Sequence, residues 1–121
     1  MKRILYVEDD PINALILKKL LQGEFNIEHV LDGESCLKAL ERDGLELVLM
    51  DINLGNGKMD GIETFKKIRE QERTKALPVI AVTSYAMPED KQRFLKEGFS
   101  DYMAKPIERE LLSVCIRKFL H

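Results

Sequence analysis

Residues 45–51 read LELVLMD, and this stretch decides the fold. Glu46 alone interrupts its apolar run, a pattern typical of a strand that is buried on both faces of a sheet. Strands of this kind belong to parallel sheets that helices cover on both sides. The residues that follow include two glycines and an asparagine, which predict a loop. We therefore expect a central parallel strand whose carboxyl end carries Asp51.

Apolar runs and amphipathic stretches alternate outward from this strand in both directions. Further strands are expected at Ile4–Val7, Phe25–Leu31, Leu77–Val82 and Tyr102–Ala104. Helices are expected to begin near Asp10-Pro11, Asp32-Gly33, Asp60, Pro88 and Lys105-Pro106. A strand and a helix thus alternate five times, which predicts an α/β, doubly wound parallel sheet with helices on both faces. Such sheets bind ligands beyond the carboxyl ends of their strands.

Two helices carry specific expectations. The first helix repeats large apolar residues at helical spacing, which predicts its buried face: Ile12, Leu15, Ile16 and Leu20. The stretch Pro88–Gly98 has few apolar residues, chiefly Phe94 and Leu95, and we expect it to be the least firmly packed helix.

Length and composition limit the class of protein. The chain has 121 residues, 45% hydrophobic and 33% charged, with a formal net charge of −2, which fits one globular domain over residues 1–121. This charge balance favours neither direct nucleic-acid binding nor binding to an anionic membrane. No apolar run reaches the length of a membrane span or of a signal-peptide core. Cys36 and Cys115 are far apart and are expected to be reduced core residues of a cytoplasmic protein.

Acidic, hydroxyl and basic side chains follow the predicted strands. They are Glu8, Asp9 and Asp10 after the first strand, Asp51 after the third, Thr83 and Ser84 after the fourth, and Lys105 after the fifth. Two like charges 5 Å apart repel by roughly 3 kcal/mol at an effective dielectric constant near 20, so the acidic cluster needs cations. Lysine supplies one charge, and a hard ion with oxygen ligands, Mg²⁺ above all, suits the rest. A carboxylate beside Mg²⁺ and a lysine can accept a phosphoryl group.

Five segments, ILYVEDD, LVLMDINL, MDGIE, VIAVTSYA and DYMAKPI, together resemble the receiver domain of two-component response regulators, the CheY-like proteins. The resemblance runs from residue 4 to residue 107 and implies a flavodoxin-like (βα)5 fold with strand order 2-1-3-4-5. It implies a phosphorylation-dependent signalling switch that catalyses only its own phosphorylation and dephosphorylation. It is thus not an enzyme that turns over an outside metabolite.

The resemblance also assigns roles to single residues. Asp51 matches the residue that accepts a phosphoryl group from a phosphohistidine, and Lys105 the lysine that pairs with that group. The ligands of Mg²⁺, or of Mn²⁺ in its place, are matched by Glu8, Asp9, Asp51 and the backbone carbonyl of Asn53. Thr83 matches the hydroxyl that binds the phosphoryl oxygens and Tyr102 the aromatic switch residue. Pro106 matches a proline that often follows a cis peptide bond.

The implied partners are proteins. The phosphodonor is a sensor histidine kinase or a phosphotransfer protein. A downstream protein target is expected on the surface formed by the helix Pro88–Gly98, the strand Tyr102–Ala104 and the last helix, and a homodimer formed on phosphorylation is a further option. The chain is either a stand-alone regulator or the receiver of a hybrid histidine kinase.

The sequence departs from the family pattern near Asp51. The loop from Asp51 to Asp60 is two residues longer than the common spacing, and Gly55 stands where proline is usual. Asp10 adds a third consecutive acid, which we interpret as a helix cap, and Tyr85 is bulky enough to shield the phosphoryl group from water.

Two other functions compete with the switch. A phosphohydrolase of the haloacid-dehalogenase type would carry a second acid where this chain has Asn53. A flavodoxin-like FMN carrier would have to place a phosphate beside the acidic loop after the first strand.

Overall fold

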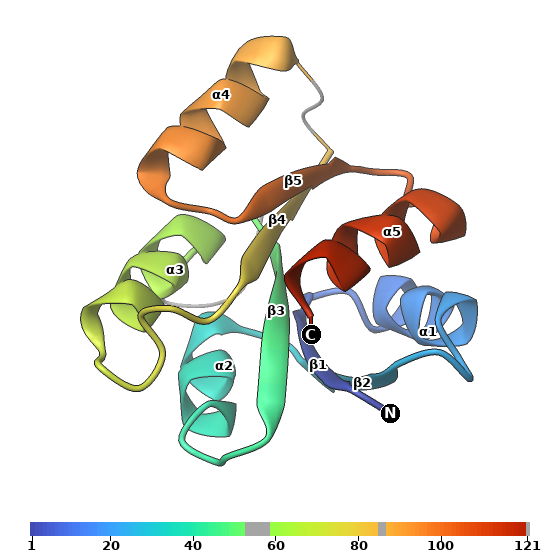
Figure 1. Cartoon of the computed structure of the whole chain (residues 1–121), viewed down its shortest axis with the longest axis horizontal. Coiled ribbons are helices and arrows are strands. Elements are labelled where there is room, and N and C mark those ends of the chain that lie inside the picture. The colour runs from blue at the N-terminus through green and yellow to red at the C-terminus, as the bar shows by residue number, and fades with distance from the viewer. Residues whose placement is uncertain (53–58, 85–86, 121) are drawn as a thin grey trace.

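The computed structural model describes residues 1–52, 59–84 and 87–120. Five parallel strands form one sheet in the order β2-β1-β3-β4-β5, which confirms the predicted fold (Figure 1). The strands are β1 Arg3–Val7, β2 Asn26–Val30, β3 Leu45–Asp51, β4 Val79–Thr83 and β5 Asp101–Ala104. The helices are α1 Pro11–Leu20, α2 Gly33–Ala39, α3 Gly61–Glu70, α4 Pro88–Glu97 and α5 Arg109–Phe119.

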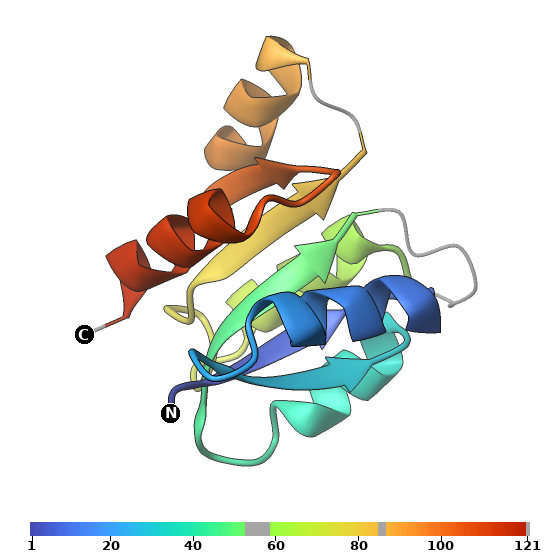
Figure 2. The same cartoon turned by 90° about the vertical axis from the view of Figure 1, so that its right-hand side faces the viewer.

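Helices cover both faces of the sheet and bury two separate apolar cores. α1 and α5 lie on one face, and α2 and α3 lie on the other, with α4 beside the β5 edge (Figures 1 and 2). Side chains alternate between the cores along each strand, as the pleat requires. In β1, for example, Leu5 and Val7 pack with α2, α3 and α4, whereas Ile4 and Tyr6 pack with α1 and α5. This alternation decides which face each residue at a strand end approaches.

Hydrogen bonds confirm the predicted starts of α1 and α3, whereas the last helix begins at Arg109, a few residues after Lys105-Pro106. The Asp10 carboxylate accepts the backbone N–H of Ile12 at 2.9 Å, and the Asp60 carboxylate accepts that of Glu63 at 2.8 Å. Each cap satisfies a backbone donor that the helix itself cannot pair. Asp10 therefore caps α1, as the sequence predicted.

The predicted buried face of α1 is wrong. Ala14 and Leu17 face the core, whereas Ile12, Leu15 and Ile16 are 69%, 54% and 53% exposed. Apolar residues lie on most sides of this helix, so helical spacing marks more than one stripe, and packing against the sheet decides between them. The result is a helix with a second, uncovered apolar face.

A close backbone contact joins the end of β3 to the start of α3. A Cβ atom at Gly61 would lie 2.4 Å from the carbonyl oxygen of Asp51 and 2.8 Å from the Cα atom of Ile52. Both distances are too short for real atoms, so this position requires glycine. The contact fixes where α3 begins relative to Asp51.

Across the described ranges, no helix is both long and apolar enough to cross a bilayer. Cys36 and Cys115 are buried free thiols, as the sequence predicted.

Candidate functional site

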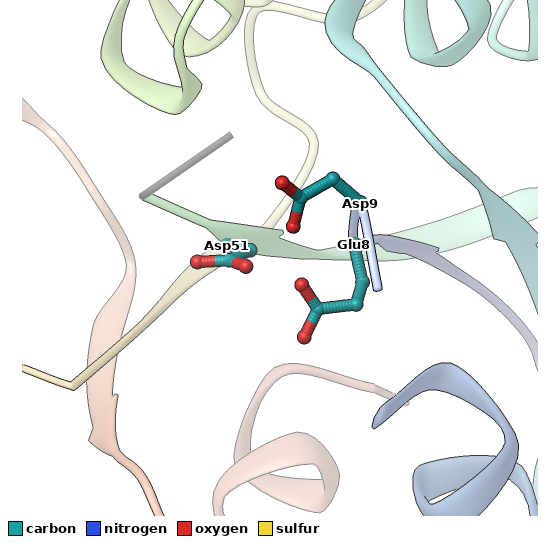
Figure 3. A group of neighbouring side chains, drawn as sticks. All are labelled: Glu8, Asp9 and Asp51. Atoms are coloured by element: carbon teal, nitrogen blue, oxygen red, sulfur yellow. The ribbon is translucent and has the colours of Figure 1, made fainter. Parts of the chain in front are cut away.

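Three carboxylates meet at the carboxyl edge of the sheet. Asp51 ends β3, and Glu8 and Asp9 directly follow β1, its hydrogen-bonded neighbour. One carboxylate oxygen from each residue lies within 4.8 Å of the others, and Figure 3 shows the three side chains grouped beside the end of β3. Glu8 and Asp51 are only 1% and 2% exposed. Buried carboxylates need nearby positive charge or hydrogen-bond donors, because burial removes their water.

Lys105 supplies positive charge to this cluster. Its amine lies 3.0 Å from Oε1 of Glu8 and 3.3 Å from Oδ2 of Asp51. Burial lowers the pKa of Lys105, but its contacts with Glu8 and Asp51 outweigh that effect, and the net pKa is raised. Burial and the neighbouring Asp51 raise the pKa of Glu8 against the opposing effect of Lys105. The amine is shared by two buried carboxylates, an arrangement that leaves a negative excess at the site.

Two residues from outside the predicted site hold Glu8 in place. The hydroxyl of Tyr6 donates to Oε1 of Glu8 at 3.0 Å, and Nε2 of His29 lies 2.7 Å from the Glu8 carbonyl oxygen. Burial and the Glu8 carboxylate raise the pKa of Tyr6, so the phenol keeps its proton and acts as a donor. The sequence pattern predicts neither contact. The pleat offered a signal for Tyr6, because residues two apart on a strand share a face.

Thr83 lies on the neighbouring strand but approaches the other face. It ends β4, is completely buried, and its carbonyl oxygen accepts the Lys105 N–H at 2.8 Å. By strand alternation Thr83 shares a face with Ala81 in the core of α2, α3 and α4. Asp51 follows Leu49 on the face of α1 and α5. The two side chains therefore reach the edge of the sheet from opposite sides.

Tyr102 lies on β5 on the same face as Thr83 and belongs to a row of aromatic rings. Its ring stacks on Phe94 of α4 with centroids 5.7 Å apart, and Phe94 meets Phe99 edge-on at 5.7 Å. Phe99 in turn stacks on Phe65 of α3 at 3.8 Å. Direct ring contacts therefore connect β5 with α4 and with α3.

The structure therefore brings together most of the predicted site residues. Glu8, Asp9, Asp51 and Lys105 form one cluster, and Thr83 ends the adjacent strand. Ser84 is exposed, and the Lys105–Pro106 peptide bond is cis, as expected. Asn53, Gly55 and Tyr85 lie outside the described residues, so the expectations for them remain predictions.

The donor chemistry of the cluster fits a hard divalent cation. All three acidic groups offer carboxylate oxygens, which Mg²⁺ and Ca²⁺ prefer over nitrogen or sulfur ligands. A divalent ion would offset the negative excess that Lys105 leaves. The same cluster places a cation 3.3 Å from the Asp51 carboxylate, and a carboxylate with nearby positive charge is suited to accept a phosphoryl group.

Comparison with known protein families agrees with this geometry. Residues 4–117 match the response regulator receiver domain. The chain belongs to this family, whose members are the receiver domains of two-component signalling systems.

Several relatives are sensor kinases that are much longer than this chain, which spans only a small part of their length. The chain is 36% identical over 120 residues to the sensor protein GacS of Pseudomonas syringae pv. syringae, covering 95% of this chain and 13% of that protein. It is 39% identical over 112 residues to the signal transduction histidine-protein kinase BarA of Escherichia coli K12, covering 90% of this chain and 12% of the kinase. It also resembles a 14.6 kDa protein of Leptolyngbya boryana, with 38% identity over 106 residues, 87% of this chain and 79% of the relative.

Solved structures show the same fold. The receiver domain of the sensor histidine kinase PA1611 of Pseudomonas aeruginosa, solved with a magnesium ion in its active-site cleft, has a TM-score of 0.86 at 32% identity and covers 98% of this chain and 96% of its own. The chemotaxis protein CheY4 of Vibrio cholerae has a TM-score of 0.87 at 26% identity, over 99% of both chains.

Proposed function

We propose that residues 1–121 act as a single receiver domain that switches a signal when Asp51 is phosphorylated. The observation that supports this most directly is the placement of Asp51. Its buried carboxylate ends the central strand β3, lies 3.3 Å from the Lys105 amine and belongs to the group with Glu8 and Asp9. We assign the phosphodonor to a histidine kinase or a phosphotransfer protein, the partners with which receiver domains work.

In this proposal the Asp51 carboxylate attacks the phosphorus of a phosphohistidine. A carboxylate oxygen–phosphorus bond forms, the nitrogen–phosphorus bond breaks, and the imidazole leaves with the electron pair. Lys105 offsets the charge on the phosphoryl oxygens, and Thr83 donates its hydroxyl to one of them. Glu8, Asp9, Asp51 and the Asn53 carbonyl are the proposed ligands of Mg²⁺, which supplies further charge neutralisation when bound. The domain is thus a phosphoacceptor that acts on itself.

The signal is proposed to leave through α4, β5 and α5. Movement of Thr83 towards the phosphoryl group vacates space on the face that Tyr102 shares. Because Tyr102 stacks on Phe94, a change at Tyr102 reaches α4 directly. A local change of charge thereby biases an element between two arrangements.

We further propose that the phosphodonor docks on the uncovered face of α1. Ile16 of this face lines a cavity of about 440 Å³ that also borders Tyr6, Lys105 and Ile107. The apolar face is therefore continuous with the proposed phosphorylation site. Exposed apolar clusters beside a site are typical of interaction surfaces. The expected occupant is a helical protein surface that presents a phosphohistidine.

Intact-mass measurement after incubation with acetyl phosphate and Mg²⁺ tests the central step. The wild-type chain should gain one phosphoryl group, and Asp51→Asn and wild type in excess EDTA should gain none. Ser113→Ala, a substitution on α5 away from the site, serves as the control and should label like wild type. Stable labelling of Asp51→Asn, or full labelling in EDTA, contradicts the proposal.

A second experiment tests the docking face. Ile16→Asp should be labelled normally by acetyl phosphate but should accept phosphoryl groups from a histidine kinase at least about tenfold more slowly. A central interface side chain contributes more than about 1 kcal/mol, and tenfold corresponds to about 1.4 kcal/mol. Equal loss with both donors would mean that the substitution damages the site itself.

A further inference from the structure

Tyr6 places a buried hydroxyl group in the apolar core, where a strand residue usually has an apolar side chain. Its side chain is 1% exposed and packs with α1 and α5 on the face that also receives Glu8. Phenylalanine would fill the same space without a polar atom to satisfy. A buried tyrosine hydroxyl needs a partner, and here that partner is Oε1 of Glu8, 3.0 Å away.

Glu8 is held at both its backbone and its carboxylate. Its N–H donates to the Val30 carbonyl at 3.0 Å, and its own carbonyl oxygen lies 2.7 Å from Nε2 of His29. Its Oε1 receives both the Tyr6 hydroxyl and the Lys105 amine, each at 3.0 Å. The residue thus has fixed contacts to β2, to β1 and to the segment after β5.

The two donors on Oε1 differ in what else they bind. The Lys105 amine is shared with Oδ2 of Asp51, at 3.3 Å, and is the group that a phosphoryl group on Asp51 would attract. Tyr6 borders the same cavity as Lys105, but its neutral hydroxyl donates to Oε1 of Glu8 and carries no charge that a phosphoryl group would attract. Tyr6 can therefore keep its contact with Glu8 if Lys105 turns towards a phosphoryl group on Asp51.

We propose that Tyr6 is a positioning residue for the Mg²⁺ site: its buried hydroxyl holds the Glu8 carboxylate in place and frees Lys105 to serve Asp51 and the phosphoryl group. This inference rests on the proposed function, because it takes Glu8 as part of the Mg²⁺ site. It predicts that the phenol acts on metal binding through Glu8. A residue that served packing alone would affect only folding stability.

The first test is Tyr6→Phe, which removes one oxygen and keeps the ring. Calorimetric titration with MgCl₂, without phosphodonor, should give a dissociation constant about tenfold higher than that of wild type, since outer-sphere partners typically change metal affinity by 10–100-fold. In acetyl phosphate labelling, the Mg²⁺ concentration for half-maximal rate should rise by a similar factor, and the rate at saturating Mg²⁺ should fall less.

Thr74→Val provides the matched control. Its hydroxyl is a buried donor to the Ile68 carbonyl at 2.6 Å, in the segment before β4 at the opposite edge of the sheet. It should lose folding stability on the same scale as Tyr6→Phe while its Mg²⁺ affinity stays that of wild type. An equal fall in Mg²⁺ affinity for both variants would overturn the proposal and would mean that Tyr6 contributes only to packing.

A double-mutant cycle with Glu8→Gln asks whether Tyr6 acts through Glu8. If it does, adding Tyr6→Phe to Glu8→Gln should change Mg²⁺ affinity by less than twofold, because the contact is already altered. The same tenfold loss in both backgrounds would overturn the proposal.

A measurement on the wild-type chain keeps the test independent of variant folding. With ¹³Cζ-labelled tyrosine, the Tyr6 resonance should shift during MgCl₂ titration along the same binding curve as the amides of Glu8 and Asp9. A Tyr6 resonance that stays fixed while those amides move overturns the role of Tyr6 alone. If no resonance responds to MgCl₂, the Mg²⁺ site of the proposed function fails as well.

Discussion

The side chains of the β1–β3–α3 region are much more deeply buried than those of the β5–α4 region. The last five residues of β3 are buried, whereas all four residues of β5 are half-buried. α3 buries Gly61, Thr64, Phe65 and Ile68, but among the α4 side chains that the structure describes only Phe94 is buried. Few buried apolar contacts mean a low free energy of local opening. The three carboxylates thus lie at the ends of firmly packed strands, whereas Lys105 follows the half-buried β5, against which α4 packs.

In the proposed function, this difference lets one domain keep its acidic residues in place and still respond to phosphorylation. A phosphoacceptor needs its carboxylates in fixed positions. A switch needs an element whose two arrangements differ by only a few kcal/mol. The expectation that Pro88–Gly98 is thinly packed agrees with the exposure of its side chains, and the comparison can be tested by perturbing each region in turn.

The largest effect is expected from truncating the firm region. Ile68→Ala on α3 removes a completely buried side chain and should lower the free energy of unfolding by about 2–5 kcal/mol. Leu95→Ala on α4, where the side chain is 37% exposed, should cost less than about 1 kcal/mol. Urea unfolding of both variants measures the two values. Similar losses of unfolding free energy in the two variants would contradict the difference in packing between α3 and α4.

The next effect concerns the charge of the cluster. Lys105→Met removes the cation from the buried Glu8 and Asp51 carboxylates and should cost about 1–3 kcal/mol in metal-free buffer, since buried charged groups lose their partner. Millimolar Mg²⁺ should recover part of this loss, because an ion that binds only the folded state stabilises it. Thermal unfolding with and without MgCl₂ gives the measurement. Lys118→Met, at a partly exposed ion pair on α5, should show no such recovery.

Hydrogen exchange should show the difference without any substitution. Amides of α4 should exchange at least tenfold faster than those of α3, which corresponds to about 1.4 kcal/mol in the free energy of opening. Native-state exchange followed by NMR resolves the two helices. Equal protection would contradict the view that α4 is the weakly held element.

The smallest effect is expected at Asp101, which ties β5 to α5. Burial raises the pKa of Asp101, but the Tyr102 N–H, Lys118 and Cys115 outweigh burial and lower it below its ordinary value of 3.8. A lowered pKa means that this carboxylate contributes stability above pH 3.8 and loses it as the pH falls through the folded-state value. Asp101→Asn should therefore cost about 0.5–1 kcal/mol at pH 7 and have a flatter stability curve below pH 4. Urea unfolding across pH 3–7 compares it with wild type, and parallel curves would contradict this account.

Much of the fold and of the candidate site could be predicted, because both depend on local patterns. Asp51 follows a continuous apolar run, and Asp10 and Asp60 precede amphipathic stretches, so strand ends and helix caps show in the sequence itself. Parallel strands then bring residues at their ends to one edge. The sequence alone therefore predicts that Glu8, Asp51 and Lys105 lie together.

Other features depend on packing between distant segments and left no comparable pattern. α1 has apolar residues on most sides, so its buried face was decided by the strands beneath it and not by its own periodicity. The contact between Tyr6 and Glu8 depends on the exact approach of two side chains at a strand end. The aromatic row from Tyr102 to Phe65 joins residues from three elements, which spacing along the chain cannot reveal.

The contact between Gly61 and the end of β3 has a consequence for how this sequence can diverge. Asp51 and Gly61 are two anchor points in close contact, and the resemblance to receiver domains implies that the chain between them is two residues longer than the common spacing. Because the contact fixes the start of α3 against the end of β3, we expect length changes between these anchors to leave the Asp51 carboxylate in place, while Gly61 itself admits no side chain. If Asp51 accepts a phosphoryl group as proposed, sequence changes between the two anchors can occur without moving the carboxylate that receives it.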